Sequence, residues 1–253
     1  QACAPATVHN LIISDVPGDS LVDIASGPTV GDPTTCADAL QIIDRYNVSL
    51  SAQIRSHLEK GLYETPKPDS PTFAHVKSQL IATAQHSLTA AAEIAQQQGY
   101  SPLLLGDAIE GESREVAKVL AGIAQSIVRH QHPLSAPCVL LSGGETTVTV
   151  RRRGQGGPNA EFLLSLLIAL QGHAQIYGLA ADTDGVDGNM EIAGAWFSPH
   201  TLHKAWDRGL NPLQFLDQHN AHRFFGLLGQ QLITGPTHTN VNDFRALLIT
   251  PPN

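Results

Sequence analysis

The chain has 253 residues, of which 42% are hydrophobic and 15% are charged. This length suits two domains or parts of two, and the composition excludes a disordered or fibrous protein. The formal net charge of -8 argues against nucleic acid or an anionic membrane as the main partner, so a small molecule is the expected ligand.

Cysteine usage and hydropathy predict a cytoplasmic protein. The three cysteines, Cys3, Cys36 and Cys138, fit no metal-binding spacing and indicate free thiols. No apolar stretch reaches the ~18 residues of a membrane helix, and no signal-peptide pattern opens the chain. A membrane partner is not expected, and a homo-oligomer stays open. Because the chain opens with Gln1 instead of Met, we expect it to be a fragment of a longer protein.

The first third of the chain predicts short strands, one helix and a long loop. In chain order these are a strand at 8–14, a helix at 37–46, a loop with three prolines at 64–71 and a strand at 76–82. Thr34 or Thr35 is the expected N-cap of the helix.

From residue 87 onward, helical and strand patterns alternate. Helices are predicted at 87–98, 113–129 and 162–170, and strands at 103–105, 139–142, 146–150, 176–181 and 244–249. Ser113 is expected to cap the second of these helices. The alternation predicts an α/β fold, with a mixed or parallel sheet covered by helices on both faces. In such sheets ligands bind where strands end, so function is expected in those loops.

Two carboxylates, Asp15 and Asp19, flank the turn after the first strand. Such a pair suits Mg²⁺ beside a phosphate, and a carboxylate can accept a proton from a hydroxyl group. An Asx turn explains the same residues without any ligand. The segment alone leaves both interpretations open.

Paired glycines, Gly143 and Gly144, precede Glu145 directly after the strand at 139–142. Glycines let backbone N–H groups approach an anion closely. The segment is neither a dinucleotide-binding fingerprint nor a Walker loop, because no lysine follows. Further on, residues 151–157 form a basic loop that we expect to be flexible. It either closes over phosphates or forms a solvated hairpin end.

Three acidic residues fall within residues 182–188. A calcium loop is excluded because Val186 occupies the fifth position and no glutamate stands at the twelfth. A Mg²⁺ or substrate site remains open, since Mg²⁺ needs only one or two carboxylates. A plain turn explains the pattern equally well.

Residues 235–243 combine turn residues with short hydroxyl and amide side chains just before the last predicted strand. Such a loop suits the binding of a hydroxy acid.

The 12 histidines include two pairs at helical i, i+3 spacing, His200/His203 and His219/His222. No third ligand falls close by in the sequence. We therefore expect surface or capping histidines and no metal site of this kind.

Four segments resemble the glycerate kinase family of the glycerate 2-kinase type that ends in the MOFRL domain, whose members were also named hydroxypyruvate reductases. They are residues 14–32 (SDVPGDSLVDIASGPTVGD), 141–150 (LSGGETTVTV), 181–188 (ADTDGVDG) and 234–243 (TGPTHTNVND). The resemblance implies ATP- and Mg²⁺-dependent phosphorylation of D-glycerate. It also implies that residues 1–98 are the C-terminal part of a Rossmann-like domain and 99–253 the MOFRL domain, with the active site between the two domains.

The resemblance further implies roles for individual residues. Those that match active-site positions of the family are Asp15, Glu145, Asp184 and Asn240. Neighbours implied to bind substrate or nucleotide are Asp19, Gly143, Gly144, Thr183, Asp187 and Thr239. Asp15 and Asp184 are the implied Mg²⁺ ligands. These residue types suit phosphoryl transfer, which depends on positioning and charge neutralisation.

Two departures from the family predict weak catalysis by the chain as given. The family's preceding segment, with a lysine expected to contact substrate or phosphate, is absent from the chain. The family also reads Gly-Gly-Arg-Asn-Gln-Glu where this chain has Pro158 in place of the arginine and Ala160 in place of the glutamine. An arginine is a natural clamp for a carboxylate or phosphate, and proline is not.

Two other functions stay open. A hydroxypyruvate reductase using NAD(P)H is one, although the sequence has no Gly-x-Gly-x-x-Gly between a strand and a helix. A non-catalytic binding or assembly module is the other, and Pro158 favours it over the reductase.

Overall fold

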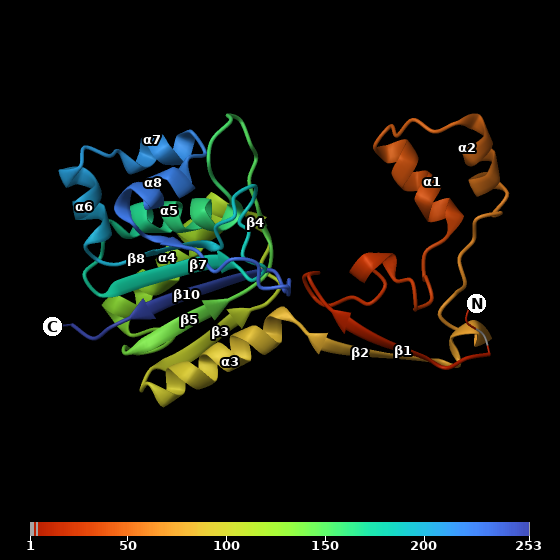
Figure 1. The fold of residues 1–253 in the computed structure, drawn as a ribbon, viewed down its shortest axis with the longest axis horizontal. Helices are drawn as coiled ribbons and strands as arrows, with labels where there is room; N and C mark the ends of the chain where they lie inside the picture. The colour runs from red at the N-terminus through yellow and green to blue at the C-terminus, as the bar shows by residue number, and fades with distance from the viewer. Residues whose placement is uncertain (1–2, 4, 253) are drawn as a thin grey trace. The chain divides into compact units, whose positions relative to one another are not determined.

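The computed structural model describes residue 3 and residues 5–252 (Figure 1). By contacts the chain forms two compact units: unit 1 comprises residues 1–12 and 19–81, and unit 2 comprises residues 13–18 and 82–253. The contact boundary between the two units lies at Ala82. The reason is helix α3 (Ala84–Gln97), whose Leu88 and Ala92 pack against Val139 and Leu141 of unit 2.

Unit 1 holds a two-stranded sheet of β1 (Val8–Ile13) and β2 (Val76–Ala82) together with helices α1 (Cys36–Arg45) and α2 (Ala52–Glu59). The strands and α1 were predicted; α2 was not. The structure confirms Thr35 as the N-cap of α1, where it forms a reciprocal capping box with Asp38. Short 3-10 turns complete the unit at Ile24–Ser26 and Pro71–Phe73.

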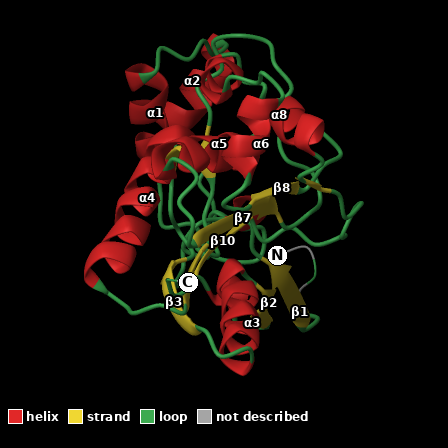
Figure 2. Ribbon diagram, turned by 90° about the vertical axis from the view of Figure 1, so that its left-hand side faces the viewer, coloured by secondary structure: helices red, strands yellow, loops and turns green. Residues whose placement is uncertain are grey.

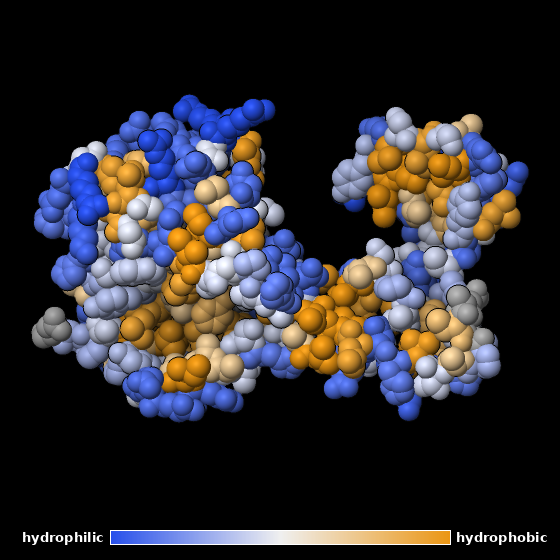
Figure 3. Space-filling model, viewed as in Figure 1, coloured by the Kyte–Doolittle hydropathy of each residue, from blue (hydrophilic) through white to orange (hydrophobic). Residues whose placement is uncertain are grey.

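Unit 1 buries few apolar side chains. Among its described residues only Ile24 and Cys36 are buried apolar groups, whereas Ile42, Tyr46 and Leu62 are more than half exposed. Figure 3 shows apolar side chains at the surface over α1 and α2. Burial of apolar surface is the main stabilising term in folding, so this unit has little core of its own.

Unit 2 is built on a six-stranded mixed sheet, which confirms the predicted α/β class. Its strand order is β3 (Ser101–Gly106), β5 (Cys138–Ser142), β10 (Asp243–Ile249), β7 (Ile176–Asp182), β8 (Gly194–Phe197) and β9 (Gln231–Leu232). Strands β3 and β5 are parallel, and β10 runs antiparallel to both of its neighbours. Strands β5 and β7 lie on either side of β10 and run in the direction opposite to it. The loops that follow β5 and β7 therefore lie at the same end of the sheet as the N-terminus of β10.

Helices cover both faces of this sheet (Figure 2). Helix α3 packs on one face, and α4 (Ser113–His130) and α5 (Pro158–Leu170) pack on the other. The remaining helices are α6 (Thr201–Asp207), α7 (Pro212–Asp217) and α8 (Ala221–Leu228). Phe162, Leu163 and Leu166 of α5 are fully buried, so this helix is the centre of the larger core. No helix in the described part of the chain combines the length and apolar character needed to cross a bilayer.

Two local predictions were wrong. The strand expected at 146–150 extends only over β6 (Thr146–Thr147), which pairs with β4 (Gly111–Glu112). Ser113 does not cap α4, because its hydroxyl group bonds to Thr146 Oγ1 and to the Thr147 carbonyl oxygen, both at 3.0 Å. The serine therefore joins α4 to β6.

Candidate functional site

Asp15 and Glu145 come from distant parts of the sequence and lie in one electrostatic environment. Asp15 follows β1, where the buried Ser14 donates its backbone N–H to the carbonyl oxygen of Ala82 (3.0 Å). Glu145 lies in the loop after β5. Partial burial of its carboxyl group, then the charges of Asp243 and Asp15, raise the pKa of Glu145.

Asp184 and Asn240 contact each other across the loops that follow β7 and precede β10. Asn240 Nδ2 donates to Asp184 Oδ2 over 3.4 Å. The loop around Asp184 is ordered by backbone bonds: Val186 N donates to Asp184 Oδ1 (2.7 Å), and Asp184 N donates to Asp182 Oδ1 (2.9 Å). Burial, with the neighbouring charge of Asp184, raises the pKa of Asp182 to about 7.

Asp243, at the start of β10, links these two pairs. Its charge contributes to the raised pKa of both Glu145 and Asp182. Its backbone N–H donates to the carbonyl oxygen of Gly144 (3.1 Å), and its carboxylate forms an ion pair with the fully buried Arg245. Glu145 and Asp182 are therefore both influenced by one buried carboxylate, which was not predicted as part of the site. We call Asp15, Glu145, Asp182, Asp184, Asn240 and Asp243 the acidic cluster.

The paired glycines serve close backbone packing. The N–H group of Gly143 donates to the carbonyl oxygen of Gly106 (2.9 Å), so it is not free to bind an anion. Gly144 has a φ of 96°, and a Cβ there would lie 2.2 Å from the backbone nitrogen of Ile109. Only glycine fits that position. These contacts shape the loop that presents Glu145.

Asp187 is buried and holds the start of α5. Its two carboxylate oxygens accept hydrogen bonds from the backbone N–H groups of Asn159 (3.0 Å) and Ala160 (2.8 Å), which no residue of the helix satisfies. His222 Nε2 lies 2.9 Å from the same carboxylate. Asp187 has no face free for a ligand, and we leave it out of the proposed binding set.

Two family models match separate parts of the chain. The MOFRL family model matches residues 138–243, and the model of a domain of unknown function, DUF4147, matches residues 1–59. The first contains most of the acidic cluster.

Relatives extend the likeness to almost the whole chain. The glycerate kinase of Macaca fascicularis is 32% identical over 297 residues, which cover 99% of this chain and 74% of that protein. The chain belongs to the glycerate kinase family. Within this family it is also 38% identical to glycerate 2-kinase of Pyrococcus horikoshii, over 95% of the chain and 55% of that protein. An Agrobacterium vitis protein with the provisional name hydroxypyruvate reductase is 48% identical, over 98% of the chain and 56% of that protein.

A solved structure shows the same fold in this glycerate kinase family. The crystal structure of glycerate kinase from Thermotoga maritima matches with a TM-score of 0.87 and 36% identity, over 98% of this chain and 58% of that chain. The chain thus spans between one half and two thirds of the length of the most similar of these relatives.

Three further residues implied by the family resemblance, Thr183, Thr239 and Asp19, lie in three different loops. Thr183 Oγ1 donates to the Asn242 carbonyl oxygen (2.8 Å), which joins the loops after β7 and before β10. Thr239 bonds through its backbone to Thr237 Oγ1. Asp19 belongs to unit 1 and has a φ of 57°, so the carboxylates of Asp15 and Asp19 fall in different units.

Two histidines expected at the surface are buried, and this prediction was wrong. His219 Nδ1 lies 2.8 Å from Glu161 Oε2, and Glu161 also accepts hydrogen bonds from the guanidinium of Arg114. His222 is fully buried beside Asp187. The two residues do not share a helix, because His219 precedes α8 and has a φ of 53°. Their buried partners lie far away in the sequence. His203 does lie at the surface, 3.6 Å from Asp207.

The acidic cluster suits a Mg²⁺ ion that is shared with a phosphate. In the described part of the chain no three His, Cys, Asp or Glu side chains are arranged to hold a metal by themselves. Burial, with smaller contributions from neighbouring carboxylates, raises the pKa values of Asp182 and Glu145, so a cation bound here would favour their charged forms. Mg²⁺ commonly takes one or two carboxylates and completes its shell with water and phosphate, which fits this arrangement.

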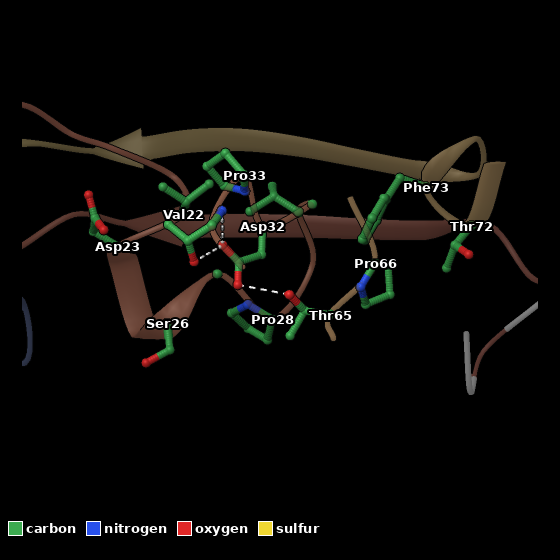
Figure 4. Close-up of a pocket in the computed structure, with 14 residues that line it drawn as sticks. Val22, Asp23, Ser26, Pro28, Asp32, Pro33, Thr65, Pro66, Thr72 and Phe73 are labelled. Atoms are coloured by element: carbon green, nitrogen blue, oxygen red, sulfur yellow. Dashed lines mark hydrogen bonds between the residues drawn. The ribbon is translucent and has the colours of Figure 1, made fainter. Parts of the chain in front are cut away.

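Unit 1 contains a separate cavity of ≈ 580 Å³ between residues 22–34 and 65–73 (Figure 4). Asp32 joins its walls by accepting hydrogen bonds from Thr34 Oγ1 (2.7 Å) and Thr65 Oγ1 (2.8 Å), which lower the pKa of its carboxyl group. Asp23 and Asp32 line the cavity, and no lysine or arginine does. Its charge does not suit a phosphate or a carboxylate ligand.

Proposed function

We propose that this chain is the larger part of a glycerate kinase that transfers a phosphoryl group from ATP to D-glycerate with Mg²⁺. The observation that carries the proposal is the pairing of Asp184 with Asn240 beside Asp182. The names of the Pyrococcus and Thermotoga relatives, both glycerate 2-kinases, favour the 2-hydroxyl group as the acceptor.

The acidic cluster supplies the groups that this chemistry needs. Phosphoryl transfer requires little covalent chemistry from the protein and depends on positioning and charge neutralisation. Asn240 offers an amide donor to the hydroxy acid, and Glu145, whose pKa is raised, accepts the proton of the attacking hydroxyl group. Asp15 and Asp184 would hold Mg²⁺, which neutralises phosphate charge when it is bound.

The domain assignment belongs to the same proposal. We assign residues 99–253 to the MOFRL domain and the part before them to the Rossmann-like domain, although α3 packs with unit 2. We also propose a cytoplasmic protein whose partner is a small-molecule substrate, and we leave its assembly state to a sedimentation measurement.

A coupled assay tests the function on an N-terminally extended form, matched in length to the relatives. We expect release of ADP that requires both D-glycerate and Mg²⁺. The name of the Agrobacterium relative makes hydroxypyruvate reductase the second candidate. Oxidation of NADH with hydroxypyruvate, without any glycerate-dependent release of ADP, would exclude the kinase. A protein that does neither would be a binding or assembly module.

A further inference from the structure

A pocket of ≈ 390 Å³ in unit 2 lies beside the start of α5. Its lining includes Arg152, Arg153, Gly156, Pro158, Asn189 and His219. Four glycines contribute to the wall, and a Cβ on one of them, Gly156, would lie 2.7 Å from the carbonyl oxygen of His219. The glycines therefore allow this loop to pack closely against the backbone at His219, and they also leave the pocket open.

The arginine-bearing loop is fastened on both sides of the two arginines. Before them, the backbone N–H of Arg151 donates to His219 Nε2 (3.1 Å). After them, the backbone N–H of Gln155 donates to Asn220 Oδ1 (2.9 Å), and its carbonyl oxygen accepts from the N–H of His222 (3.1 Å). The flexible loop expected from the sequence is thus anchored to the turn before α8.

His219 is itself held in one orientation. Because Nε2 accepts the hydrogen bond of Arg151, Nδ1 carries the proton and donates it to Glu161 Oε2 (2.8 Å). The charge of Glu161 is met by Arg114, whose Nη2 lies 2.8 Å from Oε1. The carboxylate at the base of the pocket therefore does not neutralise Arg152 and Arg153.

Both arginines are exposed and free of partners. In residues 5–252 no carboxylate lies within 4 Å of either guanidinium, and neither side chain makes a hydrogen bond within the chain. What sets these two arginines apart is that they are adjacent and both line the same pocket. They mark a local site for an anion.

We propose that Arg152 and Arg153 bind the phosphate groups of a polyphosphate ligand in this pocket, a role for which Pro158 offers no donor. The proposal rests on the proposed function, because ATP is the polyphosphate that a kinase binds. Each guanidinium presents a planar fork that matches two phosphate oxygens, so two adjacent forks suit a di- or triphosphate better than a single carboxylate. The acidic cluster then serves the hydroxy acid and the cation, and the arginine loop serves the phosphates.

Calorimetric titration of the 253-residue chain with inorganic triphosphate tests the site without any turnover. We expect binding by the unchanged chain and a Kd at least ~30-fold higher for Arg152→Ala/Arg153→Ala, since the variant loses its charge-assisted hydrogen bonds to the phosphates. Arg152→Lys/Arg153→Lys should lie between the two, because it keeps charge and loses the fork. The matched control is Arg129→Ala, an exposed arginine of α4 outside the pocket, which should leave the Kd unchanged.

The outcomes separate this inference from the proposed function. Equal Kd values for the unchanged chain and the double alanine variant would overturn it, as would no binding of triphosphate at all or an equal effect of Arg129→Ala. Equal melting temperatures confirm that the variants are folded. If the double alanine variant melts lower, Arg152→Lys/Arg153→Lys is compared with the unchanged chain in its place. Triphosphate binding that depends on both arginines, in a protein whose extended form does not phosphorylate glycerate, would support the site and reject the kinase.

Discussion

Asn240 donates a hydrogen bond from Nδ2 to Oδ2 of Asp184 over 3.4 Å and so joins two loops that lie 56 residues apart in the sequence. The contact forms because β10 runs antiparallel to β7 and pairs Asp243 with Asp182. The loop that precedes β10 and the loop that follows β7 must therefore meet. An amide donor and a carboxylate acceptor side by side are suited to orient a hydroxy acid.

The first prediction concerns this pair in the N-terminally extended form. Asp184→Asn should lower kcat with D-glycerate and ATP about 100-fold or more, the usual effect of losing a group that acts on a proton or a charge in the transition state. Asn240→Ala should cost about 10-fold and act mainly on KM, because it removes one neutral donor. Steady-state release of ADP measures both. Asp207→Asn, an exposed acid of α6, is the control, and an equal loss in that variant would contradict a local role.

The second prediction follows from the raised pKa of Asp182. An unfolded aspartate titrates near 3.8, whereas burial raises the pKa of the folded residue to about 7. Between these values the folded protein binds more protons than the unfolded one, so this group makes stability fall as the pH rises. Asp182→Asn removes that dependence and should be more stable than the unchanged chain at pH 8.

Urea unfolding at pH 5 and pH 8 measures this difference. The advantage of Asp182→Asn should be larger at pH 8, because the unchanged chain carries the buried negative charge there. An advantage of the same size at both pH values would contradict the burial of a titrating carboxyl group. Asp207→Asn again provides an exposed comparison.

The third prediction concerns the buried Asp187. Asp187→Ala leaves the backbone N–H groups of Asn159 and Ala160 without their acceptor. Breaking a buried charged contact from one side costs about 3 to 5 kcal/mol. Asp207→Ala removes an exposed contact and should change the free energy of unfolding by less than ~1 kcal/mol. Urea denaturation curves compare the two, and similar losses would argue against the structural role.

The fourth prediction concerns Gly144. Gly144→Ala should lower the free energy of unfolding by at least ~3 kcal/mol, since the added Cβ meets the backbone of Ile109 in addition to the positive φ. Gly209 has a φ of 67° and open space around it, so Gly209→Ala should cost only about 1 to 2 kcal/mol. Thermal unfolding of both variants tests the difference. Equal melting temperatures would show that the Gly144 backbone moves aside.

Much of the fold was predictable because its patterns are local. The apolar run from Phe162 to Leu170 identifies α5, and the structure extends this helix back to Pro158, whose fixed φ suits the first turn. Helices α6 to α8 have six to eight residues each, and such short segments carry too little periodicity to identify.

The buried polar contacts were not predictable from one sequence. His222 and Asp187 meet only because α8 packs beside the start of α5, and no spacing in the sequence indicates that contact. Asp243 was visible in the last loop motif, but its position between Glu145 and Asp182 depends on the placement of β10 in the middle of the sheet. Sequence motifs identified the candidate loops, and topology determined which of their residues meet.

The last prediction concerns Pro158, the first residue of α5 and part of the arginine-lined pocket. The 253-residue chain should release ADP at a rate near background, because the lysine-bearing segment of the family is absent from it and Pro158 has neither a side-chain donor nor an N–H group. In the extended form, Pro158→Arg should raise kcat, and the gain should be larger when Arg152 and Arg153 are replaced by alanine. A single charge-assisted donor at a transition state is worth about 100- to 1,000-fold, so a rescue of that order is measurable. Pro158→Ala, which keeps the helix start and adds no donor, should give no gain. The contrary result is turnover of the unmodified 253-residue chain at about 1 to 100 per second, the ordinary range of kinases. That result would show that neither the family's lysine nor the family's arginine, which Pro158 replaces, is needed.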